Sequence, residues 1–429
     1  MASLRTLALA CTLLTTPCLI AQSTTPLTLP QAEAIALTNQ PRLLAAQQRS
    51  LAAAARVREA RSAYLPTLAF NATGVRVADT ATSTAAGALT TSAISDRFAY
   101  GGQLSQLVTD FGRTSALVGS SRSNAQAQNS LATLTKAQVR LNVRDAYFEV
   151  LGAEAVLRAA QAAQSNRHLV AKQLNALAEN ELRSTVDVNF AEVLASEADL
   201  AVVKAQSVVA QQRAHLTTAM GASQTISAPL TDPSAPEALP PDPDGLQANA
   251  QTQRADLSAA EAQQHAAQQF AKAEKRLSYP TLSIGAAGGQ VPYHDHTLQD
   301  SYAAAGFNLN IPIFNGGLYA ARRTAAQSEA NARSNDVREL HLEVTEQVRS
   351  SWQRANEAFQ SLAVTAHLVA QTKEALRLAQ ARYDAGLGSI VELNEAQVNE
   401  TSAEISAADA NYTYLSRRAE LDFAAGLLN

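Results

Sequence analysis

Two groups of side chains in this 429-residue sequence could do chemistry. In the first, His294-Asp295-His296, two imidazoles and a carboxylate could hold Zn²⁺ or Cu²⁺, although a simple polar turn in an exposed loop is the competing interpretation. The second group is acidic: Asp187, Glu392 and Glu395 follow two corresponding turns. By spacing alone they could simply begin solvated helices, because Asp and Glu are common in a first turn.

Enzyme motifs are missing from the sequence. It contains no GxSxG, HExxH, P-loop or glycine-rich dinucleotide turn, so we expect no catalytic site and no cofactor. The net charge of −4, without a basic stripe interleaved with aromatic residues, argues against a nucleic-acid partner. Trp352 and Phe359 lie seven residues apart on one helix face, and we expect them to be packing residues.

The acidic turns belong to an internal repeat. Residues 383–397, YDAGLGSIVELNEAQ, align with residues 179–192, ENELRSTVDVNFAE, at an offset of 205. The same offset aligns VRDAYF, which begins at Val143, with VRSSWQ, which begins at Val348. The chain therefore reads as one structural unit written twice, with a first unit at 22–228, a proline-rich linker at 229–245 and a second unit at 246–429.

The first residues are typical of a secretory signal peptide, which we place at 1–21. Arg5 supplies a basic start, and an apolar run leads to a small-residue cleavage site. Both cysteines, Cys11 and Cys18, lie within this peptide, so we expect the exported protein to have no disulfide and no catalytic thiol. Lipidation at Cys18 is an alternative, but Pro17 precedes it where a small residue is expected.

Long helices should dominate the fold, because aromatic residues are only 5% and Ala fills long tracts. Pro41 should divide the first helical segment, with Asn39 as a possible cap. At about 1.5 Å per residue, each of the two longest segments would extend on the order of 100 Å. The predicted helical segments are 29–63, 113–178, 187–219, 246–277, 318–385 and 392–424.

Two segments, about 67–111 and 281–316, alternate apolar and polar residues as β-hairpins do. Each run is close to the length of about 9 to 11 residues that a tilted transmembrane strand needs, and no later stretch is apolar enough for a membrane-spanning helix. Two soluble hairpins packed on the helices are the alternative. Four strands cannot close a membrane barrel, so the membrane interpretation requires an oligomer, and three chains give twelve strands.

The order of these motifs resembles the TolC family of outer-membrane efflux channels. YLP and SYP end the helices before the hairpins, FG and NGG follow them, and the turn GLGSIVELNEAQ begins at Gly386. The resemblance covers about residues 28–427 and implies a mixed α and β membrane protein. In such a homotrimer, long helical hairpins form a periplasmic α-barrel and four strands per chain complete a 12-stranded β-barrel in the outer membrane of a Gram-negative bacterium.

The resemblance also implies a function and partners. The protein would be a passive duct for tripartite efflux or type I secretion, closed at the periplasmic helix-turn-helix tips. It would open when a periplasmic adaptor and an inner-membrane pump of the RND or ABC type dock. The Ala, Ser and Gln wall specifies no cargo. A periplasmic coiled-coil scaffold or adaptor without channel activity is the alternative function.

Site residues are carried over position by position. The resemblance implies that Glu392 and Glu395 match acidic positions that ring the periplasmic constriction, where crowded carboxylates attract cations and repel anions. Asp187 and Tyr383 match positions whose polar links hold the tip closed. Gly388 stands where the family has a gating arginine, so Arg183, its equivalent in the first unit, would supply the ion pair.

Overall fold

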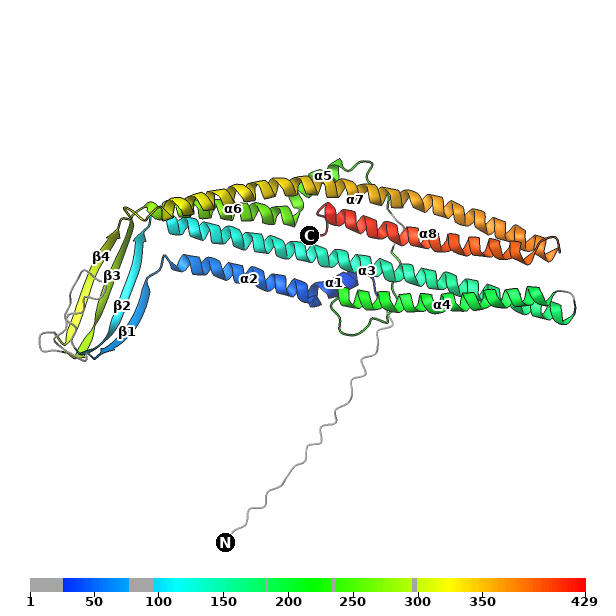
Figure 1. Ribbon diagram of the computed structural model, residues 1–429, viewed down its shortest axis with the longest axis horizontal. Coiled ribbons are helices and arrows are strands. Elements are labelled where there is room, and N and C mark those ends of the chain that lie inside the picture. The colour runs from blue at the N-terminus through cyan, green and yellow to red at the C-terminus, as the bar shows by residue number, and fades with distance from the viewer. Residues whose placement is uncertain (1–25, 77–95, 182–183, 234–236, 295–298) are drawn as a thin grey trace, which may run out of the picture.

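The computed structural model describes residues 26–76, 96–181, 184–233, 237–294 and 299–429. The predicted signal peptide, with Cys18, lies outside these ranges. Figure 1 shows an elongated molecule with a sheet at one end and the tips of two helical hairpins at the other. The elements are α1 (Leu29–Asn39), α2 (Pro41–Ser62), β1 (Thr67–Val75), β2 (Arg97–Thr109), α3 (Arg113–Glu179), α4 (Thr185–Ala219), α5 (Asp244–Gln253), α6 (Ala255–Lys275), a 3₁₀ turn (Arg276–Ser278), β3 (Thr281–Tyr293), β4 (Ser301–Asn310), α7 (Leu318–Asp384) and α8 (Ile390–Ala424).

The strands form a single antiparallel sheet in the order β1-β2-β3-β4. The two predicted hairpins are thus joined through β2 and β3, where Gly101 faces Gly289. A Cβ atom on either glycine would meet the facing backbone within 3 Å, so only glycine fits this crossing. β4 ends at Asn310, so the last residues of the predicted hairpin segment, 311–316, follow the strand rather than belong to it. Within the chain, β1 and β4 are the outer strands and each has one partner.

Two helices of 67 residues, α3 and α7, extend from the sheet to the tips (Figure 1). Each follows a glycine with positive φ, Gly112 at 91° and Gly317 at 85°. The start of α3 is fixed by Asp110, whose buried carboxylate accepts hydrogen bonds from the Gly112 and Thr114 amides. Among the described residues, no helix combines the length and the apolar character needed to cross a lipid bilayer.

The short helices α1 and α2 continue the line of α4 (Figure 1). Pro41 begins α2 as predicted, but the N-cap residue is Gln40 rather than Asn39, because proline fixes the first helical position and the cap precedes it. The Gln40 Nε2 atom donates to the carbonyls of Thr218 at 3.2 Å and Ala219 at 2.9 Å, which closes the end of α4.

An equivalent junction joins α8 to α5 and α6. The break between α5 and α6 falls at Arg254, a buried residue that no proline announces. Its guanidinium pairs with Asp256 at 2.5 Å and donates to the Gln347 side chain at 2.9 Å and the Ala424 carbonyl at 3.2 Å. The charge is therefore compensated where three helices meet, which offsets its burial.

Aromatic donors hold the described parts of the linker against the helices. The hydroxyl of Tyr147 in α3 donates a hydrogen bond to the Thr231 carbonyl at 2.7 Å. The hydroxyl of Tyr412 in α8 donates to the Asp232 carboxylate at 2.8 Å. Trp352 of α7 donates to the Pro240 carbonyl at 3.1 Å. Trp352 thus contacts the linker through a hydrogen bond, and its role as a packing residue stays a prediction.

Candidate functional site at the helical tips

The turn between α7 and α8 is built by backbone hydrogen bonds and one cap. Gly386 has φ of 72°, and the Leu387 amide bonds back to the Arg382 carbonyl at 2.8 Å. Ser389 then caps α8 by accepting from the Glu392 amide at 3.1 Å. A left-handed glycine ends one helix and a serine begins the next, so Glu392 is held in the first turn of α8, where the helix dipole favours a carboxylate.

The turn between α3 and α4 follows the same plan with one difference. Glu181 occupies the position of Gly386 and adopts the left-handed conformation with φ of 58°. Ser184 caps α4, and Asp187, which is half-buried, lies in its first turn. Among the described residues, no cation pairs with Asp187. Arg183 lies outside the described ranges, so its proposed link stays a prediction.

Tyr383 lies where the two hairpins meet. Its ring is buried, with 8% of its surface exposed, in an apolar cluster to which all four tip helices contribute. Leu174 comes from α3, Val188 from α4 and Leu393 from α8. Tyr383 therefore holds the two hairpins together through packing, whatever polar links its hydroxyl adds.

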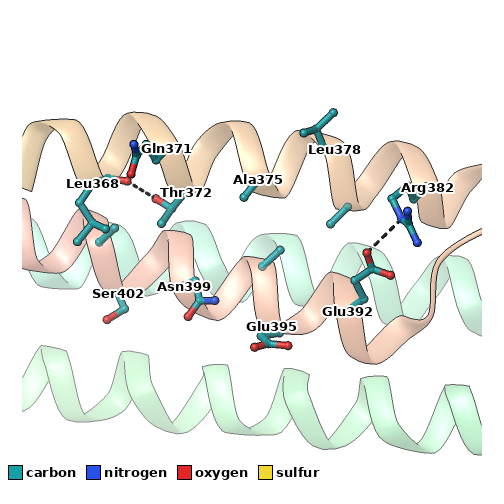
Figure 2. A pocket seen from close by; sticks show the side chains of 13 residues that line it. Leu368, Gln371, Thr372, Ala375, Leu378, Arg382, Glu392, Glu395, Asn399 and Ser402 are labelled. Atoms are coloured by element: carbon teal, nitrogen blue, oxygen red, sulfur yellow. Dashed lines mark hydrogen bonds and ion pairs between the residues drawn. The ribbon is translucent and has the colours of Figure 1, made fainter.

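Glu392 and Glu395 lie along a groove between α7 and α8, shown in Figure 2. The groove encloses about 760 Å³, and its charged lining residues are Arg382, Glu392 and Glu395. Glu392 points toward Arg382 and forms an ion pair with an Nε–Oε1 distance of 3.1 Å, whereas Glu395 points away from α7 (Figure 2). Both side chains are about half exposed, so the ion pair contributes little to the stability of the fold.

Sequence reasoning missed Arg382. Gly388 occupies the expected arginine position, so the partner was sought in the other half of the chain. The turn instead brings Arg382, ten residues before Glu392, directly across the hairpin. That turn length was the available signal, because helices that reverse within five residues place the last turn of one beside the first turn of the next.

A second ion pair crosses the same hairpin further from the turn. Lys373 Nζ lies 2.7 Å from Glu404 Oε1. Burial and the neighbouring Glu404 carboxylate raise the pKa of Glu400, and the hydrogen bond to Glu404 raises the pKa of Lys373. Basic residues of α7 thus face acidic residues of α8 at two levels, and these ion pairs favour the observed alignment of the two helices.

The histidine group is only partly described. His294 Nε2 lies 2.8 Å from Asp300 Oδ1, while Asp295 and His296 fall outside the described ranges. Within the described residues, no three His, Cys, Asp or Glu side chains are placed to hold a metal ion. A metal site at His294 and His296 remains a prediction.

An antiparallel sheet joined to two very long helical hairpins is the fold of solved outer-membrane channels. The chain superposes on the Vibrio cholerae outer membrane protein VceC with a TM-score of 0.79, over 93% of this chain and 96% of that one, at 19% identity. For the Neisseria gonorrhoeae channel MtrE, in an open state, the TM-score is 0.78 over 93% and 88%, at 22% identity. At these identities the likeness shows the fold.

The family follows from the sequence profile described as "Outer membrane efflux protein", which matches residues 34–222 and 246–427; the chain belongs to this family. It is also 28% identical to TolC of Salmonella enteritidis over 124 residues and to TolC of Escherichia coli K12 over 145 residues. These matches cover 29% and 34% of this chain, and 25% and 29% of the relatives. The resemblance to the TolC family and the mixed α and β fold class are confirmed. The family is one of transport proteins.

Proposed function

We propose that the protein is a passive exit duct in the outer membrane of a Gram-negative bacterium, serving tripartite efflux or type I secretion. The observation that carries this proposal is the combination of an open sheet with two hairpins on the order of 100 Å long. The sheet would lie in lipid and the hairpins in the periplasm. We propose no enzymatic activity, in keeping with the transport family to which the chain belongs.

The sheet supports an oligomer, and the resemblance to the TolC family sets the number of copies at three. β1 and β4 are outer strands, and they carry apolar side chains that are largely exposed, with Phe70 at 72% and Phe307 at 76%. An unpaired strand edge in lipid costs several kcal/mol per backbone group, so each β4 needs the β1 of another copy. Three copies would give twelve strands, an even number within the range of known membrane barrels. The helices would continue from this barrel as one tube.

The tips would be the gate. Glu392 and Glu395 of each chain would line the narrow end and favour cations, while the Tyr383 cluster and Asp187 would hold the hairpins in the closed arrangement. Docking of a periplasmic adaptor and an inner-membrane pump, of the RND or ABC type, would supply the free energy that separates them. The duct itself needs no energy source.

Single-channel conductance in a planar bilayer tests this proposal. The native protein, purified in detergent, should give a small cation-selective conductance, and Asp187→Ala should enlarge it by loosening the tip. Asp199→Ala, twelve residues further along α4, is the matched control, because Asp199 bonds to Gln164 and His168 away from the turn. A protein that stays in solution without detergent, and gives no conductance, would instead support the periplasmic scaffold.

A further inference from the structure

Exposed cations occur on each of the four helices, α2, α3, α6 and α7, near the end that meets the sheet. We define the basic collar as six of them, within the three helix turns nearest the strands: Arg58, Arg61, Arg122, Lys272, Lys275 and Arg322. Figure 1 shows that these helix ends all lie beside the sheet. Among the described residues, no collar residue forms an ion pair with an acidic side chain, so the six charges are not neutralised within the chain.

Few acidic residues oppose the collar. Glu274 is buried, and Asp110 is buried and occupied in capping α3, so Glu59 is the exposed carboxylate on these helix ends. The collar also recurs at an offset of 214 residues, which places Arg58 on Lys272 and Arg61 on Lys275. Both pre-strand helices therefore end in two exposed positive charges.

The helix dipole accounts for only part of this pattern. Cations in the last turns of α2 and α6 are favoured by the negative end of each helix. Arg113 is the first residue of α3, where the dipole is positive and disfavours a cation. Arg322 is the fifth residue of α7 and Arg122 the tenth of α3, so the helix dipole stabilises neither charge and does not explain the cations on that side.

A pocket of about 630 Å³ opens within the collar, between α2, α3 and α6. Arg61 and Arg122 line it together with Tyr64, Leu65 and the Gln269 amide. Tyr64 and Leu65 are 47% and 64% exposed and lie three and two residues before β1. The pocket therefore offers two guanidinium groups beside an aromatic ring and an aliphatic chain.

We propose that the basic collar binds the headgroups of anionic glycerophospholipids in the periplasmic leaflet of the outer membrane, with one specific site in the Arg61–Arg122 pocket. One guanidinium group can bind two phosphate oxygens at once, and aromatic side chains favour the boundary between lipid and water. Near-surface cations attract anionic lipids, and basic pockets beside membrane segments hold their headgroups. This inference rests on the proposed function, because it takes the sheet to lie in the outer membrane.

Native mass spectrometry of the detergent-purified full chain tests the proposal. We would titrate phosphatidylglycerol, phosphatidylcholine and lipopolysaccharide separately and measure the lipid retained. The native protein should prefer phosphatidylglycerol. Arg61→Gln/Arg122→Gln should weaken that binding about fivefold per cation, so roughly 25-fold for the pair, and leave phosphatidylcholine unaffected.

The matched control is Arg49→Gln/Lys172→Gln, which removes the same charge from exposed positions of α2 and α3 away from the collar. It should leave phosphatidylglycerol binding within twofold of native. Lys272→Gln/Lys275→Gln tests the collar on α6, should the first variant fold poorly, and should also weaken binding.

Equal losses in the pocket and control variants would overturn the proposal, as would equal retention of phosphatidylcholine. Preferential retention of lipopolysaccharide would overturn the assignment to the periplasmic leaflet. Conductance of the same samples separates the two ideas. A conducting protein without lipid preference sinks only this inference, whereas a protein that does not insert sinks the proposed function.

Discussion

The Arg382–Glu392 pair yields a sharp prediction about ion selectivity. Arg382, Glu392 and Glu395 share one groove, so each chain contributes a local net charge of minus one there. Arg382→Gln makes it minus two, and Glu392→Gln makes it zero. We therefore expect Arg382→Gln to increase cation selectivity and Glu392→Gln to reduce it. In the proposed trimer each change is tripled.

The stability cost of these changes should be small. Both side chains of the pair are about half exposed, at 58% and 45%, and ion pairs of this kind contribute about 0.2 to 1 kcal/mol. The field at the groove changes much more, because a unit charge acts on passing ions over about a Debye length, roughly 8 to 10 Å in ordinary salt. Selectivity, rather than the melting temperature, is the informative quantity.

Reversal potentials in asymmetric KCl measure it. The double variant Arg382→Gln/Glu392→Gln restores a local charge of minus one, so its selectivity should return to the native value although the ion pair is gone. Arg377→Gln, which removes an exposed arginine paired with Glu374 outside the groove lining, is the control. A double variant that stays as different from native as either single variant would refute the charge argument.

Three further outcomes are expected. Glu181→Gly should raise the melting temperature, since it relieves a left-handed non-glycine residue and contributes up to about 1 kcal/mol. Burial, opposed by the hydrogen bond from Ser416, raises the pKa of Asp145 from 3.8 to about 6. The folded state therefore holds a proton that the unfolded chain releases, so stability falls as the pH rises from about 4 to 6. Asp145→Asn should flatten that slope in thermal melts, and an unchanged slope would contradict the assignment. Tyr412→Phe removes the hydrogen bond to Asp232 and should cost about 1 kcal/mol in denaturant unfolding, with no effect if the linker contact is absent in solution.

Much of the fold was predictable because its signals are local. Proline-free tracts predicted α3 and α7, and period-two alternation predicted the four strands. The break at Arg254 was not predictable in this way, because neither proline nor glycine stands there. It depends on a guanidinium satisfied by groups 93 and 170 residues away along the chain.

The site was predictable in position but less so in its contacts. The acidic residues were found because they follow a turn in two copies, and the structure places Glu392 and Glu395 on one groove. The pairing of Arg382 with Glu392 depends on how α7 and α8 lie side by side, which residue identity alone does not specify. Nor could spacing show that Tyr383 joins both hairpins, since its neighbours come from four helices.

The junctions at Gln40 and Arg254 have a mechanical consequence. Peptide bonds run unbroken from sheet to tip in α3 and α7, but the other two helical tracks are closed halfway by hydrogen bonds from side chains to carbonyls. When the molecule is bent or twisted, α3 and α7 resist as continuous helices. The α1–α2–α4 and α5–α6–α8 lines resist at mid-length only through a few hydrogen bonds. We therefore expect the bending stiffness of the molecule to be lowest at mid-length.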